Sequence, residues 1–228
     1  MSVNKNIVVA IDGPSASGKS TVSKQVAKAL NVTYVDSGSL YRGMTWKVLR
    51  SKVDVKDAEA VIDVKNKSKW FFYRENNVVY FEIDGEDPYE ELRSERIREN
   101  VSDVAAIPEI RQFIVQQLRD MRRFGTIVME GRDIGSVVFA DSPWKYYLDA
   151  DPEERARRRF KELKVTEGEQ NVDHVLNSLQ RRDKKDTTRK TAPLQIALGA
   201  DVVNTTNMSI DDVVNYIVEK IKAADQQE

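Results

Sequence analysis

The sequence of 228 residues contains no cysteine. A disulfide scaffold and a cysteine-ligated zinc site are therefore excluded. No apolar run approaches the roughly 18 residues of a membrane-spanning helix, and residues 1–6 lack the apolar stretch of a signal peptide. The formal net charge is only −1, so the charge calls for neither a nucleic acid nor a membrane as partner. We expect a monomeric protein of the reducing cytoplasm.

One segment matches the phosphate-binding loop of nucleoside triphosphate enzymes, G-x-x-x-x-G-K-[ST]. It runs from Gly13 to Ser20 and reads Gly-Pro-Ser-Ala-Ser-Gly-Lys-Ser. The apolar run Ile7–Ile11, typical of a buried parallel strand, precedes it, and a helical pattern with one apolar face follows it. A strand, a glycine-rich turn and a helix start are the parts that such a site needs.

The chemistry of this loop suits a triphosphate. The backbone N–H groups of the turn form a concave nest, and the helix N-terminus adds a positive dipole. Lys19 is expected to reach the β- and γ-phosphates, and the Ser20 hydroxyl to ligate Mg²⁺. We therefore expect ATP with Mg²⁺ to bind here. The residues expected to bind ATP are Gly13, Pro14, Ser15, Ala16, Ser17, Gly18, Lys19, Ser20 and Thr21.

Strands and helices alternate along most of the chain, which predicts a parallel sheet with right-handed crossovers. Helix starts are indicated at Pro108, at Pro152 and at Ser209. We expect a three-layer α/β fold of the phosphate-loop NTPase type with a five-stranded parallel sheet. The expected strands are Ile7–Ile11, Val32–Val35, Thr126–Met129, Lys145–Leu148 and Asp201–Val203.

Two stretches interrupt this alternation. In the first, Trp70–Tyr73 and Val78–Phe81 flank Glu75–Asn77, a pattern typical of two antiparallel strands and a turn. The second is crowded with Lys and Arg and poor in large apolar residues, which indicates a mobile, solvated arm or lid. We therefore expect a small inserted subdomain at 57–101, an arm at 153–190, and a core made of 1–56, 102–152 and 191–228.

A second motif, Asp36–Arg42, follows the second expected strand and leads into a helix. The carboxyl end of that strand should lie beside the phosphate-binding loop, in the crevice where ligands bind. There Arg42 can hold a second phosphate as a bidentate fork. Taken alone, the segment is explained equally well as a helix cap with an incidental surface arginine.

A third motif, Glu130–Gly135, follows the third expected strand. Its side chains point into the same crevice, where Arg132 suits a phosphate. Glu130 or Asp133 suits Mg²⁺ through a water molecule. The alternative is a β-turn with an internal pair between Arg132 and Asp133.

Together these segments resemble the bacterial cytidylate kinase family, over nearly the whole chain. The resemblance extends to Val101–Ala105, Asp149–Arg159, Arg181–Arg189 and Ala192–Leu194, whose joint order is specific. It implies an enzyme of pyrimidine nucleotide metabolism that transfers the γ-phosphoryl group of ATP to CMP or dCMP, with the insert binding the monophosphate. Because relatives can carry glycine at the position of Ser20, either this hydroxyl or that of Thr21 is a candidate metal ligand.

The resemblance also implies the roles of individual residues. Those that look like contacts to the CMP phosphate are Ser37, Arg42 and Arg132. Those that look like readers of cytosine are Ser102, Arg111 and Asp133. The ribose contacts look like Arg182 and Asp186, with Arg189 near the base and the phosphate. A carboxylate accepts from the N4 amine of cytosine, whereas uracil presents a carbonyl there. The implied catalytic residues are Lys19, Arg42, Arg132 and Asp133.

The basic arm has more than one interpretation. Arg155, Arg158 and Arg159 lie roughly on one face of the expected helix, and we expect at least one of them to bind the triphosphate of ATP when the arm closes. The excess of basic residues is also compatible with RNA binding, although only Phe160 is present to stack on a base. A solvated helix face, paired with neighbouring glutamates, is the third interpretation.

Two other functions stay open. The same core suits a kinase for another monophosphate, UMP or AMP. A nucleotide-dependent switch is disfavoured, because Asp149–Asp151 stands after the fourth expected strand in place of an N-K-x-D guanine signature.

Overall fold

The computed structural model describes residues 7–167, 172–189 and 191–225. Its strands are β1 (Val8–Asp12), β2 (Thr33–Asp36), β3 (Trp70–Glu75), β4 (Val78–Ile83), β5 (Ile127–Gly131), β6 (Trp144–Asp149) and β7 (Asp201–Asn204). Its helices are α1 (Lys19–Leu30), α2 (Ser37–Arg50), α3 (Ala58–Lys67), α4 (Glu95–Val104), α5 (Pro108–Asp120), α6 (Pro152–Glu167), α7 (Val172–Thr188) and α8 (Ile210–Asp225). Two short helical turns are η1 (Met121–Phe124) and η2 (Ile134–Val138). Among these residues, no helix has the length and hydrophobicity that crossing a membrane requires.

The strands form one sheet of seven, in the order β3-β4-β2-β5-β1-β6-β7. All the strands expected in the core are present and pair in parallel, from β2 through to β7. Every residue of β1 and β5 is buried. Both faces of these central strands are covered, which explains why they read as continuous apolar runs in the sequence.

The prediction of a five-stranded sheet was wrong, because the inserted hairpin joins the same sheet. β3 and β4 pair antiparallel around a turn at Asn76 and Asn77, whose φ values of 48° and 60° suit asparagine. The hairpin meets β2 where Tyr34 pairs with Val78, and Tyr34 N donates to Asn77 O at 2.8 Å. The residue pattern shows that these strands exist, but not which sheet edge they join.

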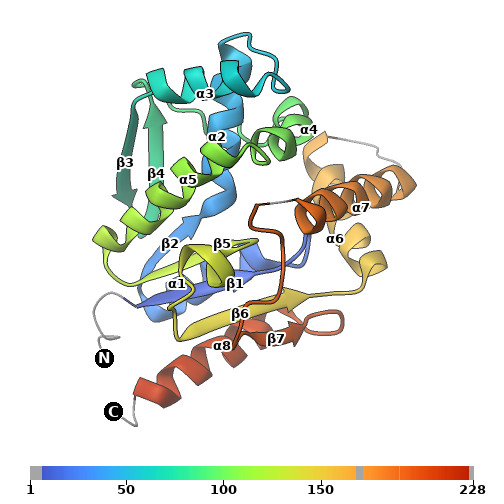
Figure 1. The fold of residues 1–228 in the computed structure, drawn as a ribbon. Coiled ribbons are helices and arrows are strands. Elements are labelled where there is room, and N and C mark those ends of the chain that lie inside the picture. The colour runs from blue at the N-terminus through green and yellow to red at the C-terminus, as the bar shows by residue number, and fades with distance from the viewer. Residues whose placement is uncertain (1–6, 168–171, 190, 226–228) are drawn as a thin grey trace.

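Helices cover both faces of the sheet (Figure 1). On one face, α1 and α8 pack together against the strands, with Val22 and Val26 of α1 in the same buried cluster as Ile217 and Ile221 of α8. The apolar stripe predicted for the first helix is therefore the face that α1 buries. This packing fixes α1, and with it the loop that precedes it, on the sheet.

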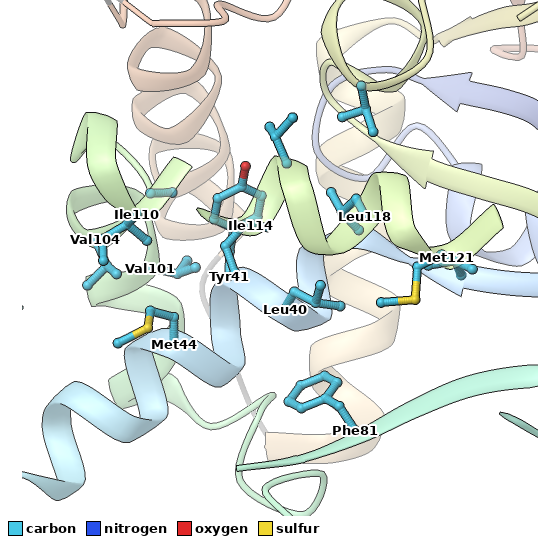
Figure 2. Close-up of a cluster of buried hydrophobic side chains, with 14 of the residues drawn as sticks. Leu40, Tyr41, Met44, Phe81, Val101, Val104, Ile110, Ile114, Leu118 and Met121 are labelled. Atoms are coloured by element: carbon cyan, nitrogen blue, oxygen red, sulfur yellow. The ribbon is translucent and has the colours of Figure 1, made fainter. Parts of the chain in front are cut away.

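On the other face, one buried cluster joins the core to the insert (Figure 2). Leu40 and Met44 of α2 and Ile114 of α5 lie in the same cluster as Phe81 of β4, and all are at most 1% exposed. The hairpin thus packs into the hydrophobic core of the sheet. The division of the chain into core, insert and arm stays a prediction.

Helices α6 and α7 pack on each other and lie beside α4, apart from the layers of the sheet (Figure 1). The buried cluster between them is small. It consists of Ala156, Leu163, Val175 and Leu179, with Ala16 of the glycine-rich loop among the partly buried residues packed against it. These helices therefore rest on the end of the sheet where the loop lies.

Candidate active site

The glycine-rich loop leaves β1 and turns into α1, as its sequence context predicts. A Cβ added at Gly13 would stand 2.2 Å from the Leu148 carbonyl oxygen of β6, so only glycine fits there. Gly18 begins α1 with φ at 89°. Lys19 folds back over the loop, and its Nζ donates to the Pro14 carbonyl at 3.0 Å. The result is a concave turn with an ammonium group at its mouth.

Lys19 is buried among other cations, with 6% of its surface exposed. Burial, followed by the charge of Arg132, lowers the pKa of Lys19 to about 7. Burial and the same arginine lower the pKa of Arg182 to about 10. In the protein alone these groups repel one another, so an anion among them is favoured. The cations that act on one another here are Lys19, Arg42, Arg132, Arg159 and Arg182.

The hydroxyl of Ser20 donates to Glu130 Oε1, which also accepts from the Tyr34 hydroxyl at 3.1 Å. Thr21, the other candidate metal ligand, is exposed. A hydroxyl next to a carboxylate is a donor set that suits Mg²⁺. No group of three or more Asp, Glu, His or Cys residues that could hold a metal by itself occurs in the described part of the chain. A metal here would therefore draw its other ligands from a phosphate and from water.

At the end of β2, Asp36 caps α2 by accepting from Ser39 N at 3.1 Å, and it also binds Arg42 Nη2 at 2.6 Å. Burial opposes ionisation of Asp36, but Arg42 and the Ser39 N–H outweigh it and lower its pKa. Ser37 lies against Gly131 at the end of β5, where an added Cβ would stand 2.5 Å from Ser37 Oγ. The second and third motifs therefore meet at one edge of the sheet.

Arg132 connects the glycine-rich loop to α7. Its Nη2 donates to Ser15 Oγ at 3.0 Å, and its Nε donates to Asp186 Oδ2 at 3.0 Å. Burial alone would lower the pKa of Arg132, but Asp186 and Glu130 outweigh it and raise that pKa. Asp133 is not the partner of Arg132, so the alternative of a turn with an internal ion pair was wrong.

Asp133 lies in a buried cluster with arginines from two other segments. Its Oδ2 is 3.4 Å from Arg111 Nη2 of α5, and its Oδ1 is 3.8 Å from Arg189 Nη2. Arg111 donates to the Tyr41 hydroxyl at 2.9 Å and stands over the ring of that tyrosine. Asp133 and Arg111 are only 3% and 2% exposed. Within the described residues, no hydrogen bond reaches Asp133 Oδ2, Arg111 Nε or Arg189 Nη2.

Ser102 is the third residue predicted to read the base. It is on α4 and lines a cleft of about 250 Å³ between α4 and the pair α6–α7. Arg159 and Arg182 line the same cleft. The structure thus brings Arg111 and Asp133 together, and it places Ser102 beside the predicted ribose contact Arg182.

The arginines of α6 face different partners. Arg155 is 8% exposed and donates to the carbonyl oxygens of Ser15 at 3.1 Å and Ala150 at 3.1 Å. Arg158 donates to Thr205 O at 2.6 Å and to Ser17 O at 3.5 Å, so it lies against the back of the loop. Arg159 pairs with Glu162 at 2.8 Å on the side of the α4 cleft. Each of these arginines is therefore paired in the protein alone.

Comparison with known proteins identifies the family. The family model described as cytidylate kinase matches residues 9–223. The cytidylate kinase of Caldanaerobacter subterraneus subsp. tengcongensis is 42% identical over 220 residues, which are 96% of this chain and 96% of that protein. The cytidylate kinase of Clostridioides difficile is 41% identical over 216 residues, which are 95% of this chain and 98% of that protein. This chain belongs to the cytidylate kinase family.

The resemblance drawn from the sequence motifs is thereby confirmed. Among solved structures, a shikimate kinase from Bacteroides thetaiotaomicron aligns with a TM-score of 0.40 and 15% identity, over 96% of this chain and 98% of that chain. A likeness of that size has no bearing on the function of this family member.

Asp12 is a residue of this cytidylate kinase that the sequence analysis missed. It ends β1, and its carboxylate accepts from Ile134 N at 2.9 Å and from Gly135 N at 2.7 Å. Burial raises the pKa of Asp12 to about 7 in spite of these two bonds. Asp12 thus anchors the loop that carries Arg132 and Asp133. An acidic residue at the end of an apolar strand, directly before the glycine-rich loop, was the signal available in the sequence.

Two more residues at the site lie inside segments that the sequence patterns single out, but no role was predicted for them. Tyr41 supports Arg111 from α2, across the helix interface shown in Figure 2. Asp183 of α7 accepts from Ser15 N at 3.1 Å. The partner of each lies far away along the chain, which is why no local pattern predicts these contacts.

Proposed function

We propose that this protein transfers the γ-phosphoryl group of ATP to CMP or dCMP, giving ADP and CDP or dCDP. Membership of the cytidylate kinase family supports the reaction. The observation that carries it is the convergence of Lys19, Arg132 and Arg182 at the mouth of the loop, with pKa values lowered to about 7 for Lys19 and about 10 for Arg182. Cations that repel one another in the protein alone form a strong site for phosphates, because each phosphate removes a repulsion.

The donor nucleotide belongs on the β1 side of this site. Its phosphates would accept from the backbone N–H groups of the loop, and Lys19 would leave the Pro14 carbonyl to reach them. Mg²⁺ would be held by the Ser20 hydroxyl, with Glu130 acting directly or through water, and bound Mg²⁺ supplies positive charge to the phosphates.

The acceptor belongs on the other side of Arg132. We propose that Arg42, Arg132 and Ser37 hold the phosphate of CMP. For Arg42 this means exchanging its bond to Asp36 for one to the phosphate. Arg182 and Asp186 lie one turn apart on α7 and are proposed to contact the ribose, with Arg189 next to them.

The base would be read at Asp133 and Arg111. Asp133 Oδ2 and Arg189 Nη2 make ion pairs but no hydrogen bonds in this buried cluster, and a ligand that hydrogen-bonds to them would offset the cost of their burial. Cytosine offers an N4 amine to the carboxylate and acceptors at N3 and O2 to the guanidinium. Uracil would place a carbonyl oxygen against Asp133, which disfavours it. Ser102 stays a predicted contact, reached when α4 and α7 approach the substrate.

The chemistry needs little proton transfer, because the acceptor oxygen is already an anionic phosphate. Catalysis then consists of alignment and charge neutralisation. Lys19 and Arg132 would face the space between the two nucleotides. Arg155 lies close to it, because it donates to the carbonyl oxygen of Ser15 in the loop. When α6 and α7 cover this space they exclude water, which would otherwise accept the phosphoryl group.

The test is ADP release from ATP·Mg²⁺ with CMP, dCMP, UMP and AMP offered in turn. We expect fast turnover with CMP and dCMP and much slower turnover with UMP and AMP. Equal or faster turnover with UMP or AMP would assign the protein to another monophosphate. ATP binding without turnover on any acceptor would contradict a kinase function and favour a switch or an RNA-binding protein. The monomeric state and the cytoplasmic location stay predictions.

A further inference from the structure

A carboxylate of α7 occupies a hydrogen-bonding position of the glycine-rich loop. Asp183 Oδ1 accepts from the Ser15 N–H at 3.1 Å, and its Oδ2 binds Arg155 Nη1. The side chains of Asp183 and Arg155 are 17% and 10% exposed. The contact joins the arm to the loop that, under the proposed function, receives the triphosphate.

The Ser15 N–H belongs to the nest of backbone donors with which such loops bind phosphate. A carboxylate is the protein group most similar to a phosphate at this position, since both accept hydrogen bonds as anions and both pair with arginine. Asp183 and a phosphate oxygen cannot both take the same place on this N–H. ATP must therefore displace Asp183 if its terminal phosphate is to use Ser15.

Arg155 does not depend on Asp183 for its position. Its Nε donates to the Ala150 carbonyl, and its Nη1 also donates to the Ser15 carbonyl at 3.1 Å. When Asp183 leaves, the guanidinium of Arg155 stays next to Ser15 with its charge uncompensated. An incoming phosphate would meet both a free N–H and a free cation.

The rest of α7 is attached in a similar way. Asp186 binds Arg132, and Lys185 binds Asp103 of α4 at 2.7 Å. Besides the small apolar cluster with α6, the described part of α7 thus makes several charged contacts. Losing the Asp183 contact would release one of these contacts and leave the others intact.

We propose that Asp183 competes with the γ-phosphate of ATP for the Ser15 N–H and Arg155. This inference rests on the proposed function. In the absence of ATP, Asp183 accepts from the Ser15 N–H and neutralises the charge of Arg155, and the γ-phosphate displaces it and takes over both contacts. The competition lowers the apparent affinity for ATP, because only the fraction with Asp183 displaced is competent to bind the γ-phosphate. ADP has no γ-phosphate and does not compete, so Asp183 can return once transfer is complete.

The experiment compares the Kd of a non-hydrolysable ATP analogue with the Kd of ADP, both with Mg²⁺ and without CMP, by calorimetry. For Asp183→Ala we expect the Kd of the ATP analogue to fall about tenfold, while the Kd of ADP changes less than about twofold. Asp183→Asn should give a smaller fall, because the amide oxygen still accepts from Ser15 but does not neutralise Arg155. Asp103→Asn, which removes a charge from the pair of Lys185 with Asp103, should leave both Kd values unchanged.

A weaker binding of the ATP analogue by Asp183→Ala, or an equal change for ATP analogue and ADP, would overturn the inference and make Asp183 a support of the fold. If Asp183→Ala melts before it can be measured, Asp183→Asn decides, since it keeps the shape of the side chain. Wild-type protein that binds neither nucleotide would instead refute the proposed function, and this inference with it.

Discussion

The core that carries the glycine-rich loop and the arm formed by α6 and α7 are built differently. The loop stands between β1 and α1, whose buried residues belong to clusters that span the sheet. Among the described side chains the arm has a buried cluster of four, and charged groups of α7 also bind Arg132, Arg155 and Asp103. The core is thus held by apolar packing, whereas the arm is also held by charged groups that are proposed to bind the substrates.

Apolar packing and ion pairs contribute different free energies to stability. Removing a large buried side chain from a packed core costs about 2–5 kcal/mol. An ion pair with exposed partners is worth about 0–1 kcal/mol, which holds for the pair of Lys185 with Asp103, whose side chains are 44% and 36% exposed. The pairs of Asp186 with Arg132 and of Asp183 with Arg155 are largely buried, so a phosphate that displaces the carboxylate has to replace its charge at the arginine.

The largest effect should come from removing the ammonium group at the mouth of the loop. We expect Lys19→Met to lower kcat by about 10²–10³, because a preorganised charge facing the transferred group is lost. The melting temperature should not fall, because methionine removes the cost of burying the Lys19 amine. Steady-state kinetics and thermal melting check this, with Lys222→Met on the exposed surface of α8 as the control. A kcat close to wild type would contradict the assignment of the loop.

A second pair of variants compares the core with the arm directly. Ile114→Ala in the core should lower the free energy of unfolding by about 2–5 kcal/mol and leave the KM for ATP nearly unchanged. Leu179→Ala, in the cluster between α6 and α7, should lower the free energy of unfolding by less than Ile114→Ala does, and it should raise the KM for ATP. Urea unfolding and initial rates measure the two quantities. Equal losses of stability with no change in KM would show that the arm is part of the core.

A third variant concerns the base. Asp133→Asn should lower kcat/KM for CMP by about tenfold and reduce the preference for CMP over UMP, because the amide can donate to a carbonyl as well as accept from an amine. Asp141→Asn, which breaks an exposed pair with Arg122, is the matched control. Unchanged kinetics with both acceptors would remove Asp133 from the base site.

The smallest expected effect is the uptake of a proton by Lys19 when ATP binds. Burial and Arg132 lower the pKa of Lys19 to about 7, so at pH 8 to 9 the amine is mostly neutral in the protein alone. Phosphates next to it raise the pKa, so ATP binding should take up close to one proton at pH 8 to 9 and almost none at pH 6. Calorimetry in buffers with different ionisation enthalpies measures this uptake. Uptake that persists in Lys19→Met would assign the proton to another group.

The most local features of the molecule could be predicted from the sequence. The strand, the loop and the helix of residues 8–30 follow from an apolar run, two glycines and a four-residue apolar spacing, all within a short segment. The hairpin at Asn76 and Asn77 follows from its turn residues in the same way. That the hairpin extends the sheet could not be predicted, because a two-residue periodicity does not say which strand lies alongside.

The candidate site divides along the same line. The sequence by itself determined which chemical groups are present. The residue types of the glycine-rich loop and of the motifs around Arg42 and Arg132 predict phosphate binding. Only the tertiary structure decided how these groups are paired. It placed Asp183 on Ser15 and Asp133 against Arg111, and it brought Ser102 and Arg182 to the lining of one cleft. Charged pairs form between the side chains that the packing of distant helices brings within a few ångströms of each other. The spacing of residues along the chain does not predict which side chains these are.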